Sequence, residues 1–167
     1  MAIEIERKFL VISEGWRPHV AGRKHLRQAY LARQGKAAVR VRTVDDASAT
    51  LTIKSRGART SRLEYEYPIP VEEALSLIEL RDGALLAKVR HIVPWGAVTW
   101  EVDVFEGENA GLIIAEVELA HEQQALDLPP WVGREITHDE RYYNSRLVHL
   151  PFCHFPADDA APQERVG

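Results

Sequence analysis

The chain has 167 residues, which suits one domain large enough to bury a hydrophobic core. Its 46% hydrophobic and 28% charged residues are ordinary for a globular protein, and its net charge of -4 argues against a general nucleic-acid binder. The single cysteine excludes an internal disulfide and a multi-cysteine zinc site, and no apolar run approaches the length of a membrane span.

The opening residues, MAIEIERKFLV, carry charges where a secretory signal would need an apolar stretch. A lone cysteine also fits a reducing compartment. The sequence therefore predicts a cytoplasmic protein with neither a membrane nor a nucleic-acid partner.

Eight segments alternate between apolar and polar residues with a period of two, and they are rich in Val, Ile, Leu, Tyr and Thr. Turn-forming Gly, Pro and Asp residues separate most of them. Eight strands with short connections predict a mainly β protein, an antiparallel meander or barrel with a few flanking helices. The expected strands are 3–11, 25–33, 37–44, 49–55, 61–69, 85–93, 98–105 and 112–120.

Helices are expected in three places. Residues 71–81 have apolar side chains at helical spacing and acids in the first turn. A shorter helix is expected over 121–126, and an amphipathic one over 139–150. Beyond Pro151 the chain becomes rich in Ala, Pro and Asp, which predicts a domain over 1–155 and a flexible tail over 156–167.

Charged residues occupy one face of nearly every expected strand. Because side chains two apart share a face, Glu4, Glu6 and Lys8 point to one side, and Arg40 and Arg42 share a side of their own strand. A solvated sheet face would explain any single strand, but like charges grouped along seven strands add nothing to stability by themselves. The grouping favours a bound ion or polyanion between the strands. The same alternation places charges at Lys54, Arg62, Glu64, Glu66, Lys88, Arg90, Glu101, Asp103, Glu116 and Glu118.

These eight acids and seven bases sum to -1, so the cluster alone would not attract a strongly anionic ligand. Carboxylates without His or Cys suit a hard divalent ion such as Mg²⁺ or Mn²⁺, and paired arginines suit phosphate oxygens. A metal ion with a polyphosphate accounts for both sets. If the sheet closes into a barrel, the charged face lines its interior and the apolar face packs under the helices.

The opening Glu4-x-Glu6-x-Lys8 resembles the signature of the CYTH superfamily, also called triphosphate tunnel metalloenzymes. The resemblance covers about residues 1–150 and implies an eight-stranded antiparallel closed barrel, a tunnel whose charged side chains point inward. The run EIERKFLV and the single short domain look most like the small bacterial inorganic triphosphatases. The signature is followed in order by Tyr30, Arg40-x-Arg42, Thr52-x-Lys54, Arg62-x-Glu64-x-Glu66, Lys88-x-Arg90, Glu101-x-Asp103-x-Phe105, Glu116-x-Glu118 and the run DERYYN over 139–144.

The resemblance also implies roles for individual residues. Glu64 and Glu66 either act in catalysis, together with Glu4, Glu6 and Lys8, or only orient Arg and Lys side chains through ion pairs. The implied metal ligands are Glu4, Glu6, Glu116 and Glu118, with Asp103 serving a second metal. The implied triphosphate contacts are Lys8, Arg40, Arg42, Lys54, Lys88 and Arg90, with Arg62 and Tyr30 as further candidates.

The expected reaction is hydrolysis of the terminal phosphoryl group of a triphosphate, foremost inorganic tripolyphosphate, with Mg²⁺ or Mn²⁺ as cofactor. Two other enzymatic functions use the same tunnel in this superfamily: class IV-type adenylate cyclase and thiamine triphosphatase. A non-catalytic polyphosphate-binding module would need the bases but not all of the acids, which are present here. Exposed apolar patches on such a barrel would also allow a homodimer.

Overall fold

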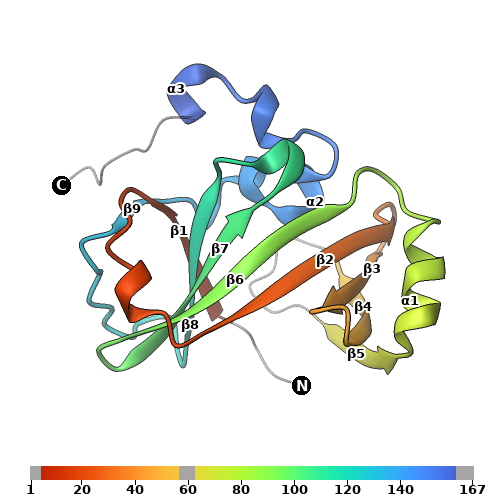
Figure 1. The fold of residues 1–167 in the computed structure, drawn as a ribbon, viewed down its shortest axis with the longest axis horizontal. Coiled ribbons are helices and arrows are strands. Elements are labelled where there is room, and N and C mark those ends of the chain that lie inside the picture. Colours follow the sequence, from red (N-terminus) through yellow and green to blue (C-terminus); the bar gives the residue numbers. More distant parts are fainter. Residues whose placement is uncertain (1–4, 57–62, 161–167) are drawn as a thin grey trace.

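The computed structural model describes residues 5–56 and 63–160. Within these ranges the protein is a curved antiparallel sheet with short helices around it (Figure 1). Its strands are β1 (Ile5–Val11), β2 (Gly22–Ala32), β3 (Ala37–Val44), β4 (Ser48–Ser55), β5 (Glu64–Ile69), β6 (Leu86–Trp95), β7 (Val98–Phe105), β8 (Ile113–Leu119) and β9 (Val132–Glu135). Its helices are α1 (Val71–Ile78), α2 (Asn144–Leu147) and α3 (Ala157–Ala160), with 3₁₀ turns η1 (Arg17–His19), η2 (Gly107–Asn109), η3 (Glu140–Tyr142) and η4 (Phe152–His154).

All eight expected strands are present, but the predicted closed barrel needs two corrections. A ninth strand, β9, pairs with β1, and the sheet order is β5-β4-β3-β2-β6-β7-β8-β1-β9. Across 5–56 and 63–160 no ladder joins β5 to β9, so the sheet is open rather than closed. The long strands β2 and β6 cross the middle, with β3, β4, β5 and α1 on one side and β1, β8 and β9 on the other (Figure 1).

Two apolar clusters cover the face of the sheet that carries no charged cluster, called here the outer face. On one side, Ala74 and Ile78 of α1 pack against Ala29, Val41 and Ala49 from β2, β3 and β4. This contact confirms the helix expected at 71–81, which ends at Ile78. The helix has acids in its first turn, as the helix dipole favours.

The second outer cluster is built around tryptophans. Trp100 of β7 packs edge-on against Trp131 and Phe9, with ring centroids 5.6 Å apart in both pairs. Such edge-to-face contacts add to the area that the rings bury. The cluster contains side chains from alternate positions of β1, β6, β7 and β8. The side chains between them therefore point to the opposite, inner face.

The inner face is charged along its middle and apolar at one end. At that end Leu10, Leu86 and Ile114 project from the strands into a third cluster. Tyr142 and Leu147, from the C-terminal segment, pack onto the same cluster. The C-terminal segment thereby covers the apolar end of the inner face and leaves the charged part beside it.

Two expectations for the helices were wrong. Residues 121–126 form no helix: a short turn ends at residue 123, and the Gln124 side chain accepts a hydrogen bond from the backbone of Ala120. Residues 139–150 are broken into η3 and α2, because Tyr143 is extended with ψ 136°. The flexible tail expected over 156–167 stays a prediction, because residues 161–167 lie outside the described ranges; within the described part α3 is present, and its Asp159 accepts a hydrogen bond of 2.8 Å from Arg141.

None of the helices in the described part of the chain has the length and apolar character needed to span a bilayer.

Candidate active site

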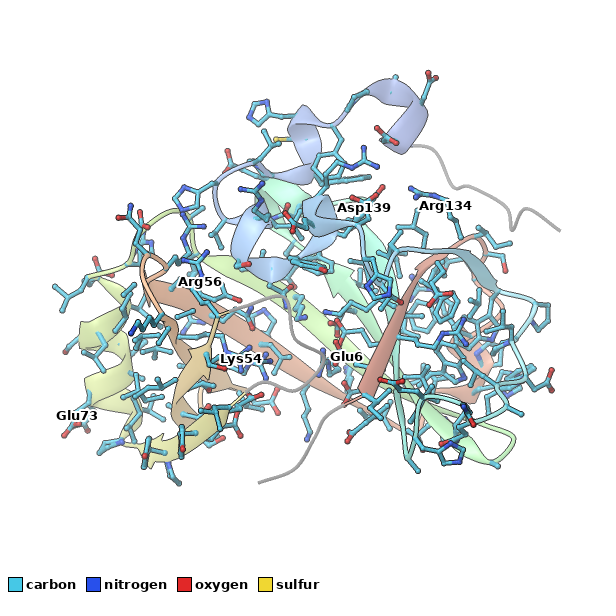
Figure 2. All side chains as sticks on the ribbon, turned by 180° about the vertical axis from the view of Figure 1, so that it is seen from behind. Glu6, Lys54, Arg56, Glu73, Arg134 and Asp139 are labelled. Carbon is cyan, nitrogen blue, oxygen red and sulfur yellow. The ribbon has the colours of Figure 1, made fainter. Side chains whose placement is uncertain are left out.

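The charged residues predicted for the site share the inner face wherever the structure describes them. Glu6 and Lys54 come from β1 and β4, which are far apart in the sheet, and both lie toward the middle of the molecule (Figure 2). Glu73 of α1, by contrast, lies at the outer rim (Figure 2). Two predicted residues, Glu4 and Arg62, fall outside the described residues.

Carboxylates face each other at the pairing of β1 with β8. Glu6 lies directly opposite Glu118, and Lys8 lies directly opposite Glu116. Like charges in register across two strands repel, so the Glu6–Glu118 pair weakens the ladder unless a cation lies between them. Glu118 is exposed, and among the residues that the structure describes no Lys, Arg or His is within ion-pair distance of it.

Lys8 joins the two carboxylate positions. Its Nζ lies 3.1 Å from Glu6 and 3.3 Å from Glu116. Burial lowers the pKa of Lys8, but Glu116 and Glu6 outweigh it and raise that pKa above its usual range. Lys8 is therefore a fixed positive charge at neutral pH.

Arg90 of β6 forms ion pairs with three carboxylates. It donates two hydrogen bonds to Asp103, of 2.7 and 2.8 Å, and one of 3.0 Å to Glu116. It also forms an ion pair with Glu101. Burial lowers the pKa of Arg90, but Asp103 and the other carboxylates overcome it and raise the pKa. Glu101 and Glu116 lie opposite each other, so Arg90 also relieves their repulsion.

Lys88 is the most deeply buried cation of the site. Its side chain is 0% exposed and forms an ion pair with Asp103, whose side chain is 0% exposed as well. Burial lowers the pKa of Lys88 even though Asp103 and Glu116 oppose the change. Lys88 and Arg90 together occupy both oxygens of Asp103, an arrangement that holds these two cations in place.

Arg42 of β3 has the opposite character. Its guanidinium donates two hydrogen bonds, of 3.1 and 3.0 Å, to the amide oxygen of Gln28. No carboxylate in the described residues forms an ion pair with it. Burial lowers its pKa to about 10, helped by the charges of Arg40 and Arg90, so it stays protonated at neutral pH.

The remaining cations of β3 and β4, Arg40 and Lys54, have fewer carboxylate contacts than Arg90 has. Arg40 donates a long hydrogen bond, 3.4 Å, to the Thr52 hydroxyl and lies 3.7 Å from Glu66. Thr52 in turn donates to Glu66, which is about half exposed. Lys54 pairs with Glu64 at 3.1 Å. These contacts favour the second of the two roles left open for Glu64 and Glu66, which is to orient cations.

The structure thus divides the predicted residues between two walls. β1, β6, β7 and β8 form an acidic wall whose bases are tied to carboxylates, and β3 and β4 form a basic wall with Arg40 and Arg42 on it. Tyr30 is buried in the apolar end cluster, opposite Arg40.

Two polar residues of the inner face were missed by the sequence analysis as site residues, Gln28 and Thr52. Both hold an arginine of the basic wall, and both are fully or nearly fully buried. A signal was available, because Gln28 stands two residues before Tyr30 and so shares its face.

A family model described as CYTH domain matches residues 2–146. The chain belongs to the CYTH family. It is 43% identical over 156 residues to an inorganic triphosphatase of Acetivibrio thermocellus, covering 93% of this chain and 99% of that protein. It is 36% identical over 152 residues to an inorganic triphosphatase of Nitrosomonas europaea, covering 87% of this chain and 96% of that protein. The crystal structure of an inorganic triphosphatase, 32% identical in sequence, matches with a TM-score of 0.67 and covers 94% of this chain and 99% of that one.

The CYTH family is one of metal-dependent enzymes, and the acidic wall offers a fitting place for a metal ion. Glu6 and Glu118 provide opposed carboxylates, and Glu118 is exposed and without a protein cation in the described residues. Hard divalent cations take such oxygen ligands. Asp103 fits less well, since two cations already enclose it; its predicted role toward a second metal stays a prediction.

Proposed function

We propose that this CYTH protein is a metal-dependent triphosphatase that cleaves the terminal phosphoryl group of inorganic tripolyphosphate. One observation carries the proposal: carboxylates outnumber cations on the acidic wall, while an arginine of the basic wall has no carboxylate partner in the described residues. The carboxylates of Glu6 and Glu118 oppose each other, while Arg42 is buried beside Arg40 with no carboxylate partner in the described residues. A divalent cation with a polyphosphate chain fits both requirements at once.

The basic wall would bind the phosphate chain. Arginine forks match phosphate oxygens in pairs, so Arg40 and Arg42 are the first candidates to fix the chain, with Lys54 beside them. Lys88 and Arg90 belong to the same proposal, and they are already oriented by Asp103. Arg62 is retained from the resemblance alone, and Tyr30 from its place opposite Arg40.

The acidic wall would hold Mg²⁺ or Mn²⁺ through Glu6, Glu116 and Glu118, with Glu4 added from the resemblance. A bound divalent cation neutralises charge on the phosphate oxygens and favours attack by water. Water forms a bond to the terminal phosphorus while the bond to the bridging oxygen breaks, which gives diphosphate and orthophosphate. The chain's own contribution is to position the substrate and stabilise its charge, which is what phosphoryl transfer requires.

Several contacts support separate duties for the acids. Lys8 and Arg90 hold Glu116 from two sides, so the glutamate has a fixed orientation. Glu64 and Glu66 pair with Lys54 and with Arg40 and Thr52, which fits an orienting role. We place the activity in the cytoplasm, a proposal that rests on the single cysteine.

The test compares tripolyphosphate, ATP and thiamine triphosphate, each with and without Mg²⁺, and measures orthophosphate and cyclic AMP. We expect orthophosphate to be released fastest from tripolyphosphate and to stop when the metal is chelated. The Glu6→Gln variant should lose metal-dependent turnover and keep the wild-type circular dichroism spectrum. Cyclic AMP formed from ATP would point to a cyclase instead. Tripolyphosphate binding without phosphate release would point to a binding module.

A further inference from the structure

Gln28 of β2 is buried between the two walls, with no exposed surface. It lies directly opposite Arg42 in the pairing of β2 with β3. Its amide oxygen accepts two hydrogen bonds from one guanidinium, at Nε and Nη2. This forked contact fixes both the position and the plane of the Arg42 guanidinium.

The choice of an amide at this position is informative. The other cations of the inner face, such as Lys8, Lys88 and Arg90, are each held by at least one carboxylate. A carboxylate opposite Arg42 would bind a buried guanidinium more strongly than an amide does, because charge-assisted hydrogen bonds are the stronger ones. An amide accepts the same two hydrogen bonds and leaves the positive charge of Arg42 uncancelled.

The other end of the Gln28 amide gives a second, independent indication. Its Nε2 is buried and has no hydrogen-bond partner in the ranges that the structure describes. The amide cannot be turned over to relieve this, because Nε2 would then face the N–H donors of Arg42. A buried donor without a partner is unfavourable, so the orientation of the amide is set by its contact with Arg42 and not by Nε2.

We propose that Gln28 is a positioning residue that aims Arg42 at the triphosphate without neutralising it. The inference rests on the proposed function and names a residue that determines how tightly the phosphate chain binds. It explains why the residue that fixes Arg42 is uncharged, in contrast to the acids that fix Lys8, Lys88 and Arg90.

The test uses two variants of Gln28 with opposite effects on Arg42. Gln28→Glu keeps the acceptor but adds a negative charge, so it should raise the KM for tripolyphosphate about tenfold or more while the melting temperature is kept or raised. Gln28→Met keeps the volume but removes the acceptor, so it should raise KM and lower the melting temperature. In both variants kcat should change less than KM, because the lost contact is to bound substrate.

Thr43→Val provides the matched control. Thr43 is the next residue after Arg42 and is nearly as buried as Gln28. It points to the outer face, where its hydroxyl has no partner in the described residues. This variant should keep the wild-type KM. If Gln28 has only a structural role, KM should change only in variants whose melting temperature also falls. A Gln28→Glu variant whose KM equals that of the wild type would therefore overturn the inference.

Wild-type protein assayed in parallel separates this inference from the proposed function. If wild type does not turn over tripolyphosphate, the dissociation constants from calorimetry replace KM. Weaker binding by Gln28→Glu then still supports the inference, although the proposed function fails. If wild type neither hydrolyses nor binds tripolyphosphate, both are wrong.

Discussion

Glu116 shows how single residues set the charge of the inner face. Burial alone would raise its pKa, but Lys8, Lys88 and Arg90 outweigh burial and hold that pKa well below the usual range. The unfolded chain, in contrast, protonates a glutamate near its ordinary pKa of about 4.3. Because the folded pKa is the lower one, Glu116 stabilises the fold above pH 4.3 or so, and this contribution is lost as the pH falls.

This difference predicts how stability depends on pH. In metal-free buffer the melting temperature of the wild type should fall as the pH decreases from about 5 to 3, and Glu116→Gln should show a smaller fall. Glu72→Gln, an exposed position on α1, should keep the wild-type slope. Melting followed by circular dichroism across the pH series measures all three proteins. Identical slopes for wild type and Glu116→Gln would show that the three cations do not act on Glu116 as described.

Among the structural elements, the strands with strict alternation were predictable and the short or irregular pieces were not. β9 has only four residues and no repeating pattern, and it exists because it can pair with β1. The apolar spacing over 139–150 suggested one helix. In the structure two short helical pieces, separated by an extended Tyr143, pack Tyr142 and Leu147 into the end cluster. A stretch of six residues such as 121–126 is too short to form a stable helix by itself.

Gly83 lies in the turn between α1 and β6, at a position where only glycine fits. Its φ is +87°, and a Cβ there would lie 2.9 Å from the backbone oxygen of Val148. Gly83→Ala should therefore lower the free energy of unfolding by about 1–3 kcal/mol, since it adds both backbone strain and a clash with the C-terminal segment. Denaturant titration measures the change.

Gly35→Ala is the matched control, because Gly35 has nearly the same φ, +82°, and no atom within 4 Å of an added Cβ. The Gly35→Ala variant should lose only the free energy of unfolding that the strained backbone conformation costs. If both alanine variants lose the same stability, the contact between the turn at Gly83 and the C-terminal segment contributes nothing.

At the scale of the whole molecule, the fold separates two kinds of charge. The sequence predicted which charged side chains share a face of each strand, because alternation determines it. It did not predict that Lys88 and Arg90 are bound by Asp103 while Arg42 is not, since that depends on which strands are neighbours in the sheet. Pairing of β6 with β7 puts Arg90 opposite Asp103, and pairing of β2 with β3 puts Arg42 opposite Gln28.

The acidic wall predicts that a divalent cation stabilises the folded protein. Mg²⁺ or Mn²⁺ should raise the melting temperature, because a ligand that binds only the folded state adds about 2.7 kcal/mol at one hundred times its dissociation constant. For a chain of this size that corresponds to several degrees, on the order of 5–10 °C. Glu118→Gln should reduce the shift, and Glu72→Gln should not. An equal shift in wild type and Glu118→Gln would remove Glu118 from the metal site.

The central claim is that one inner face holds a metal ion against β1 and β8 and a phosphate chain against β3. A crystal structure with Mn²⁺ and a tripolyphosphate analogue with methylene bridges tests it directly. The anomalous signal of Mn²⁺ should lie beside Glu6 and Glu118, with the phosphate groups in contact with Arg40 and Arg42. Phosphate groups bound to the outer face, or Mn²⁺ remote from both glutamates, would contradict the claim.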